Sequence, residues 1–153
     1  MSEKKTMKYV RLGNSGLKVS KIILGCMTYG SPEWQSWVLP EEEGIKHIKA
    51  AYDAGINAFD TADVYSNGLS EIILGKAIKQ HNMDRDRIVV MTKFWGTVGK
   101  ATSTQTIGKP GEELDAQGYV NQRGSSRKAI DSTMKHLSKK PQVPFPVYHG
   151  CSS

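Results

Sequence analysis

The sequence predicts an α/β fold in which short parallel strands alternate with helices. Residues 21–93 read as strand, helix, strand, helix, strand along a chain of 153 residues, a length that suits one domain. This alternation predicts a parallel sheet with right-handed crossovers. Its short, regular spacing fits either a (β/α) barrel or a doubly wound sheet. In both folds, functional side chains gather where the parallel strands end.

Three apolar runs are the expected strands, at residues 21–25, 56–60 and 88–92. The first run is suited to burial on both faces of a sheet. A β-hairpin is expected before it, because two short strand-like segments flank the turn sequence Gly13-Asn14-Ser15-Gly16. The chain therefore begins with an N-terminal hairpin, followed by the βα units.

Two amphipathic helices are expected between these strands. Pro40 opens the first, three glutamates follow it in the first turn, and Gly55 stands just beyond its end. Apolar residues at helical spacing mark the buried faces of the two helices. They are Ile45, Ile48, Ala51 and Tyr52 in the first helix, and Leu69, Ile72, Ile73 and Ala77 in the second.

Two connecting segments are less regular. The loop at residues 31–38 holds Trp34 and Trp37, which either line a pocket or cover the core. Residues 96–125 read as a long polar loop of the kind that is usually functional or disordered.

The last part of the chain is expected to hold one more helix and an irregular tail. The third helix starts at Ser125 or Ser126, runs to about Lys140 and stops at Pro141. A central strand in the tail is doubtful because prolines at positions 144 and 146 remove hydrogen-bond donors.

Composition is typical of a soluble globular protein. The content of 38% hydrophobic and 24% charged residues is ordinary for a globular protein, and no apolar run is long enough to span a bilayer. The net charge is +6, but no run of five basic residues occurs, so nucleic-acid binding is not expected. A polar start without an apolar segment and only two cysteines, Cys26 and Cys151, point to the reducing cytoplasm.

Three residues form the candidate chemical site. Asp60 ends one expected strand, Lys93 follows the next, and Tyr65 lies in the loop between them. If the strands are parallel neighbours, Asp60 and Lys93 project from strand ends about 5 Å apart, and Tyr65 can fold back over them. A carboxylate, an ammonium and a phenol in one pocket make up most of a proton-donating site.

Each of the three residues also has a purely structural interpretation. Asp60 could cap a loop, Lys93 could be a solvated surface lysine, and Tyr65 could only pack against the end of the sheet. No pair of histidines or cysteines has the spacing of metal ligands, so no metal site is expected. Gly13 to Gly16 do not form a phosphate-binding loop, because a strand and not a helix follows them.

At this point the sequence resembles the aldo-keto reductases, which are (β/α)8-barrel oxidoreductases that use NADPH. The matching segments are residues 12–20, Leu24-Gly25, Phe59-Asp60-Thr61-Ala62, Tyr65, Ser70-Glu71 and Thr92-Lys93. Residues 40–44 and 118–124 point more narrowly to the fungal aryl-alcohol dehydrogenases. The resemblance implies the N-terminal portion of a (β/α)8 TIM barrel, with about three to four βα units.

The resemblance implies a reductive mechanism for aryl aldehydes, which runs in reverse on aryl alcohols. Tyr65 would be the general acid. A free tyrosine has a pKa of about 10 and is a poor acid at neutral pH, so Lys93 would lower that pKa by favouring the phenolate. Asp60 would pair with Lys93 and hold it charged. Of the remaining family positions, His149 is the candidate for the tetrad histidine. Asp60 would also contact the cofactor. Met27, Thr28 and Tyr29 would line the nicotinamide and substrate pocket.

Length separates this chain from the family. Complete barrels of this type have about 250 residues. Residues 1–153 are therefore expected to form a single partial NADP-dependent domain that stops where a fourth strand should begin, with a divergent tail at 141–153. Weak or no NADP binding is expected for this chain alone. The alternatives to an active reductase are a non-catalytic half-barrel that self-associates and a fragment that pairs with a full-length homologue.

Overall fold

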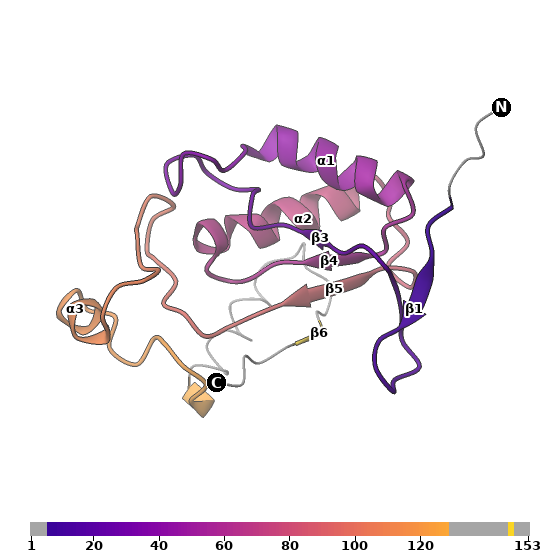
Figure 1. The fold of residues 1–153 in the computed structure, drawn as a ribbon. Coiled ribbons are helices and arrows are strands. Elements are labelled where there is room, and N and C mark those ends of the chain that lie inside the picture. The colour runs from indigo at the N-terminus through magenta and orange to yellow at the C-terminus, as the bar shows by residue number, and fades with distance from the viewer. Residues whose placement is uncertain (1–5, 129–146, 149–153) are drawn as a thin grey trace.

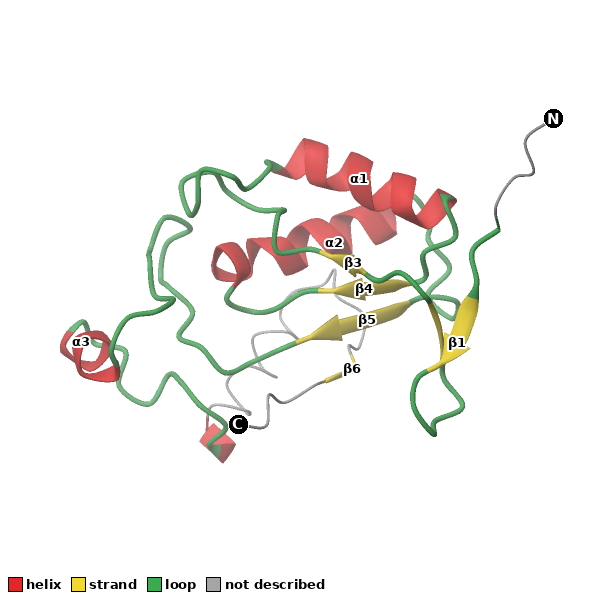
Figure 2. Cartoon of the chain, in the orientation of Figure 1, coloured by secondary structure: helices red, strands yellow, loops and turns green. Residues whose placement is uncertain are grey.

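A computed structural model of the chain describes residues 6–128 and 147–148. Two helices cover one face of a parallel sheet, and a hairpin lies at the end where the strands begin (Figure 1). The long segment after the third sheet strand extends away from the opposite end, where the strands finish (Figure 2). This arrangement leaves the carboxyl ends of the strands beside that long segment.

The N-terminal hairpin forms as predicted. Strand β1 (Tyr9–Arg11) pairs antiparallel with β2 (Lys18–Ser20), and Gly13 supplies a positive φ of 56° in the turn. The hairpin is attached to the sheet through the side chain of Asn57, whose Oδ1 accepts from the backbone N–H of Ser20 at 2.7 Å. It therefore closes the end of the sheet that lies away from the candidate site.

The sheet contains four parallel strands in the order β3-β4-β5-β6. Their bounds are β3 (Leu24–Gly25), β4 (Ala58–Asp60), β5 (Val89–Thr92) and β6 (Val147–Tyr148). Asp60 pairs in register with Gly25 on one side and with Met91 on the other. The carboxyl ends of the strands therefore lie together along one common edge of the sheet, which runs across the strands, as the sequence predicted.

Helices α1 (Glu41–Asp53) and α2 (Leu69–Gln80) build the main core against the sheet. Pro40 is the N-cap of α1, and Gly55 follows its C-cap with a φ of +91°, as expected. Phe59 and Val90 project toward the helices and are completely buried. A second, smaller cluster lies under the hairpin, where Val19 packs with residues of β4 and β5. The two clusters use alternate residues of the same strands.

The expected strand at residues 21–25 is wrong in its first half. Only Leu24 and Gly25 pair with a neighbour, while Ile22 and Ile23 are 59% and 42% exposed. In the described residues, strand β3 lies at an edge of the sheet. The residues that lead into it therefore have no strand on their outer side to bury them. The apolar pattern therefore overstated their burial.

The segment predicted as an unbroken loop contains a short helix, α3 (Gly111–Ala116). Pro110 is its N-cap, and Glu112 and Glu113 occupy its first turn, where negative charge is favourable. Only Leu114 of this helix is buried. A single buried residue leaves no apolar periodicity, which explains why the sequence pattern did not reveal the helix.

The end of the chain also departs from expectation. Val147 and Tyr148 form a fourth strand at the outer edge of the sheet, just after both prolines. An edge position tolerates the missing donors of proline better than a central one. Of the predicted third helix, residues 127 and 128 are helical, and the remainder lies outside the described residues, as does His149.

The two tryptophans of residues 31–38 differ in burial. Trp34 is buried and meets the half-exposed Trp37 edge-on, with 6.2 Å between ring centroids. In the described ranges, no helix is both long and apolar enough to cross a bilayer.

Replacing a buried isoleucine should weaken the fold far more than replacing an exposed one. Ile48 of α1 is fully buried, so Ile48→Ala should lower the free energy of unfolding by about 2–5 kcal/mol. Ile22→Ala, a matched change at an exposed site, should lower it by less than about 0.5 kcal/mol. Urea denaturation followed by circular dichroism measures both, and equal losses would contradict this packing.

Candidate active site

Asp60 and Lys93 meet at the common edge of the sheet, as predicted. Asp60 is the last residue of β4, and Lys93 directly follows β5. The Nζ atom of Lys93 lies 2.7 Å from Oδ2 of Asp60, and their side chains are 30% and 32% exposed. This partial burial keeps the attraction between them stronger than that of a surface pair.

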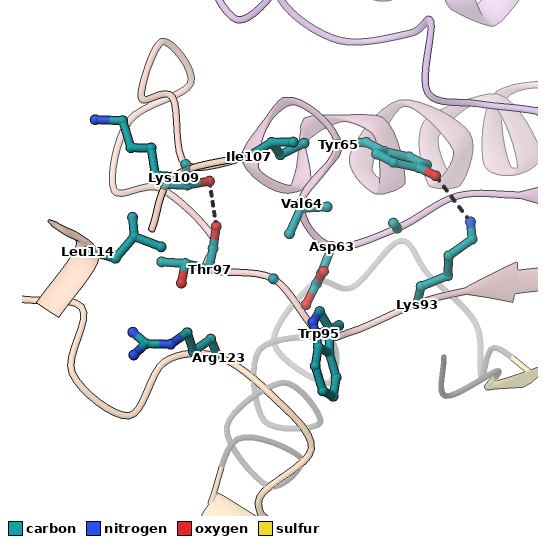
Figure 3. A pocket seen from close by; sticks show the side chains of 14 residues that line it. Asp63, Val64, Tyr65, Lys93, Trp95, Thr97, Ile107, Lys109, Leu114 and Arg123 are labelled. Carbon is teal, nitrogen blue, oxygen red and sulfur yellow. Dashed lines mark hydrogen bonds between the residues drawn. The ribbon is translucent and has the colours of Figure 1, made fainter. Parts of the chain in front are cut away.

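The Lys93 ammonium donates to three oxygens. Besides Asp60, it donates to the backbone carbonyl of Thr61 at 2.8 Å and to the phenol oxygen of Tyr65 at 3.3 Å. Figure 3 shows the contact with Tyr65. An ammonium has three N–H donors, so its hydrogen-bonding capacity is fully used. The three residues singled out from the sequence are therefore in direct contact.

The surroundings of Lys93 favour its charged form. Burial alone lowers the pKa of an ammonium, but the hydrogen bonds from Lys93 to Asp60 and Tyr65 outweigh burial and raise its pKa above the ordinary value. Lys93 is therefore positively charged at neutral pH. A cation fixed beside the Tyr65 oxygen stabilises negative charge on that oxygen.

A buried polar network supports the strand ends from below. The Ser70 hydroxyl at the start of α2 donates to the backbone carbonyl of Cys26 at 2.7 Å and lies 3.0 Å from the Thr61 hydroxyl. The Thr92 hydroxyl donates to Oε1 of Glu71 at 2.8 Å. Contacts from one helix terminus thus reach the ends of β3, β4 and β5. This network explains the Ser-Glu pair that the sequence comparison singled out.

Cys26 belongs to this support and not to the chemistry. Its thiol is completely buried, and burial raises its pKa to about 12. A thiol in that state is a poor nucleophile.

A pocket of about 380 Å³ opens beside Tyr65 and Lys93 (Figure 3). Val64, Trp95, Ile107 and Leu114 contribute apolar side chains to its lining. The pocket is thus bounded by the turn before Tyr65, the segment after Lys93 and helix α3. Sequence reasoning recognised this segment as a functional candidate but missed its lining residues; the only signal was a few large apolar residues in a polar stretch.

Two basic residues at the far side of the pocket are neutralised by neighbours. Lys109 pairs with Glu113 at 2.6 Å, and Arg123 pairs with Asp115 through two hydrogen bonds of 2.6 and 3.0 Å. The described lining therefore presents mainly apolar surface near the Tyr65 phenol.

The residues predicted to follow β3 into the pocket do not line it. Met27 and Thr28 are exposed in the loop after β3, outside this pocket. Tyr29 lies in the core and meets the His47 ring edge-on at 5.8 Å. Backbone hydrogen bonds from Tyr29 to Cys26 and from Leu39 to Thr28 turn the loop back, which directs the Tyr29 ring under α1. Tyr29 is therefore a core residue of the described chain, and its role beside the nicotinamide stays a prediction.

Removing the Lys93 charge should reduce stability in a pH-dependent way. The folded pKa of Lys93 exceeds the reference value of 10.5, so its stabilisation is complete below about pH 10.5 and is lost as pH rises through the folded pKa. Lys93→Met should therefore be less stable than the parent at about pH 8, and the difference should shrink above about pH 10.5.

Urea midpoints measured between those pH values test this expectation. Lys21→Met, at an exposed lysine before β3, should show little difference from the parent at about pH 8. A Lys93→Met deficit that stays constant through the alkaline range would contradict the assigned pairing.

Known proteins resemble this chain over most of its length. The model of the Aldo/keto reductase family matches residues 21–140. The chain is 49% identical over 138 residues to versiconal hemiacetal acetate reductase of Aspergillus parasiticus, covering 86% of this chain and 39% of that protein. It is 44% identical over 138 residues to the "Putative aryl-alcohol dehydrogenase AAD16" of Saccharomyces cerevisiae, covering 88% and 39%.

Solved structures show the same fold. The holo form of aldo-keto reductase AKR11C1 from Bacillus halodurans superposes with a TM-score of 0.65 at 26% identity, covering 94% of this chain and 40% of that one. Glycerol dehydrogenase AKR11B4 from Gluconobacter oxydans gives a TM-score of 0.62 at 23% identity, covering 93% and 38%. The chain therefore spans about two-fifths of the length of these relatives, and its fold is part of their (β/α)8 barrel. It belongs to the aldo/keto reductase family.

Proposed function

We propose that this chain carries the proton-donating part of an NADPH-dependent reductase site for aryl aldehydes, which also oxidises aryl alcohols in reverse. The observation that carries the proposal is the Lys93 ammonium, held between the Asp60 carboxylate and the Tyr65 phenol. Family membership supports the oxidoreductase class. NADPH as the cofactor and aryl aldehydes as the substrates rest on the resemblance of the sequence to fungal aryl-alcohol dehydrogenases.

Reduction of a carbonyl group needs a hydride on carbon and a proton on oxygen. NADPH supplies the hydride when it is bound. The Tyr65 O–H bond breaks as its proton moves to the carbonyl oxygen, which leaves a phenolate. Lys93 stabilises that phenolate, and Asp60 keeps the lysine charged and oriented. Such general acid catalysis contributes about 10²–10⁴-fold to the rate.

The described residues fit only the reacting end of this cofactor. The pocket beside Lys93 has a volume of about 380 Å³, but two basic residues of its lining, Lys109 and Arg123, are already paired with carboxylates. Lys93, the other basic residue of the lining, is paired with Asp60, so in residues 6–128 the pocket offers no unpaired cation to a phosphate group. We infer that the 153-residue chain binds NADP weakly or not at all by itself.

The pocket lining supports an aromatic substrate. The side chains of Val64, Trp95, Ile107 and Leu114 present apolar surface, and a flat ring buries apolar area against such surface. One relative carries the name aryl-alcohol dehydrogenase, which points to the same class. We also propose that the substrate is a small-molecule aldehyde and that the protein is located in the cytoplasm.

A second candidate function is non-catalytic. The chain spans 39% of the length of its relative from Aspergillus parasiticus, and its sheet has edges at β3 and β6 where a closed barrel has none. Such edges can pair with another chain. We therefore also propose self-association, or pairing with a full-length homologue, as an alternative to activity of the isolated chain.

Turnover that depends on the Tyr65 hydroxyl would establish the reductase. NADPH fluorescence titration should be followed by assays with veratraldehyde; any turnover should fall by at least about 100-fold in Tyr65→Phe, which removes only the acid. Tyr52→Phe, at a phenol remote from the pocket, is the matched control and should retain activity. Equal rates for the parent and Tyr65→Phe would rule out the assigned acid.

Edge pairing predicts assembly that a single charge can block. The parent should elute from gel filtration as broad or multimeric species, whereas Ile23→Lys, beside the β3 edge, should increase the monomer because edge lysines oppose strand pairing. Ile107→Lys places the same charge at a similarly exposed isoleucine that lines the pocket, away from β3, and should not increase the amount of monomer. A sharp monomer peak with cooperative melting of the parent would defeat the self-association proposal.

A further inference from the structure

The turn that carries Tyr65 has an unusual backbone. Directly after Tyr65, in the 3-10 turn η1 (Tyr65–Gly68), Ser66, Asn67 and Gly68 have φ values of 47°, 52° and 92°. Residues with side chains rarely adopt this left-handed region, and consecutive ones are held there only by their surroundings. Contacts to this turn therefore decide where the Tyr65 ring lies.

Asn67 supplies the most extensive of these contacts. Its Oδ1 accepts from the backbone N–H of Gly99 at 2.7 Å. Its Nδ2 group donates to the carbonyls of Ala101 at 2.8 Å and Thr104 at 2.9 Å, with Thr102 further away at 3.3 Å. One side-chain amide thus binds both ends of the segment at residues 99–104, more than thirty residues away in sequence. The amide uses its acceptor and both of its donors.

Glycines allow this close approach on both sides of Tyr65. A Cβ atom at Gly99 would lie 2.8 Å from Nδ2 of Asn67, and one at Gly96 would lie 2.8 Å from a methyl group of Val64. On the other side, a Cβ at Gly30 would lie 1.9 Å from the Ser66 hydroxyl. The residues before and after Tyr65 therefore fit against backbone that has no side chain.

The segment held by Asn67 continues into the pocket lining. Two residues after Thr104, the hydroxyl of Thr106 donates to the backbone carbonyl of Thr97 at 2.6 Å. The next residue, Ile107, lines the pocket. Figure 3 shows Ile107 and Tyr65 on the same side of the pocket. The side chain of Asn67 is thus hydrogen-bonded to the segment that forms one side of the pocket. The backbone of Asn67 belongs to turn η1, which carries the Tyr65 phenol.

We propose that Asn67 is a positioning residue of the reductase site, which ties residues 99–104 to the turn of Tyr65 and so sets the positions of both the phenol and the adjoining pocket wall that contains Ile107. This inference rests on the proposed function for its catalytic meaning. Asn67 does not contact Lys93 or the pocket interior. It acts by restricting the Tyr65 turn relative to Lys93, so its loss should loosen the 3.3 Å contact between those two residues.

Asn67→Gly tests the role cleanly, because glycine accepts a positive φ and only the side-chain bonds are lost. Asn82→Gly is the matched control: Asn82 has a φ of 47° just after α2, far from the site, and no side-chain hydrogen bond among the described residues. The first measurement is amide hydrogen exchange. The Gly99 N–H should exchange about tenfold faster or more in Asn67→Gly and should be unchanged in Asn82→Gly.

The second measurement reports on the phenol itself. In protein labelled with 13C at tyrosine Cζ, the Tyr65 resonance is assigned by its disappearance in Tyr65→Phe. Asn67→Gly should shift or broaden that resonance, whereas Tyr9, which donates to the carbonyl of Gly55 near the hairpin, should not change. A role limited to stability would not move the Tyr65 resonance in protein that remains folded.

Asn67→Asp provides a second variant if Asn67→Gly fails to fold. It keeps the oxygen that accepts from Gly99 but replaces the donor group by an oxygen that faces the carbonyls of Ala101 and Thr104. Gly99 should then stay protected while the Tyr65 resonance changes.

The outcomes separate this inference from the proposed function. An unmoved Tyr65 resonance in a variant whose Gly99 N–H has become labile would overturn the positioning role, and so would an unchanged Gly99 exchange rate in Asn67→Gly or an unmoved Tyr65 resonance in folded Asn67→Asp. Neither measurement needs cofactor or turnover. A chain without reductase activity whose Tyr65 resonance responds to Asn67 would defeat the proposed function and still support the positioning role.

Discussion

The contact between Lys93 and Asp60 is the interaction on which the candidate site depends. It exists because β4 and β5 are parallel neighbours in register, so both side chains emerge at the same edge of the sheet. The ion pair leaves two further protons of Lys93 for the Thr61 carbonyl and the Tyr65 phenol. An amine with all its protons directed in this way has a fixed position, and a fixed cation can polarise a neighbouring phenol without reorganising.

Core and site share the same strands because side chains alternate along them. Phe59 projects into the helix-covered core, while the next residue, Asp60, takes part in the site. Helix α2 serves both, because Ile73 and Leu74 pack in the core while Ser70, one turn earlier, reaches the strand ends. The acid–base group therefore rests on the most buried elements of the described chain. A rigid base of this kind suits chemistry that depends on distances of about 3 Å.

Much of the pocket is formed by loops and turns and not by helices and strands. Turn η1 and the segment after Lys93 are held together by the Asn67 amide and by glycines that permit close contact. The chain matches about two-fifths of the length of its relatives. The described residues therefore bring a carboxylate, an ammonium and a phenol together in one pocket.

Local sequence determined much of the fold. Alternating apolar runs and helical stripes predicted the parallel sheet, Pro40 and Gly55 marked the ends of α1, and polar residues at strand ends identified Asp60 and Lys93. These features depend on near neighbours in the chain, so they are visible in the sequence. Tertiary structure alone decided the exposure of Ile22 and Ile23, the burial of Tyr29 and the bonds of Asn67 to residues 99–104. Those outcomes depend on which distant segments meet, and no local pattern encodes that.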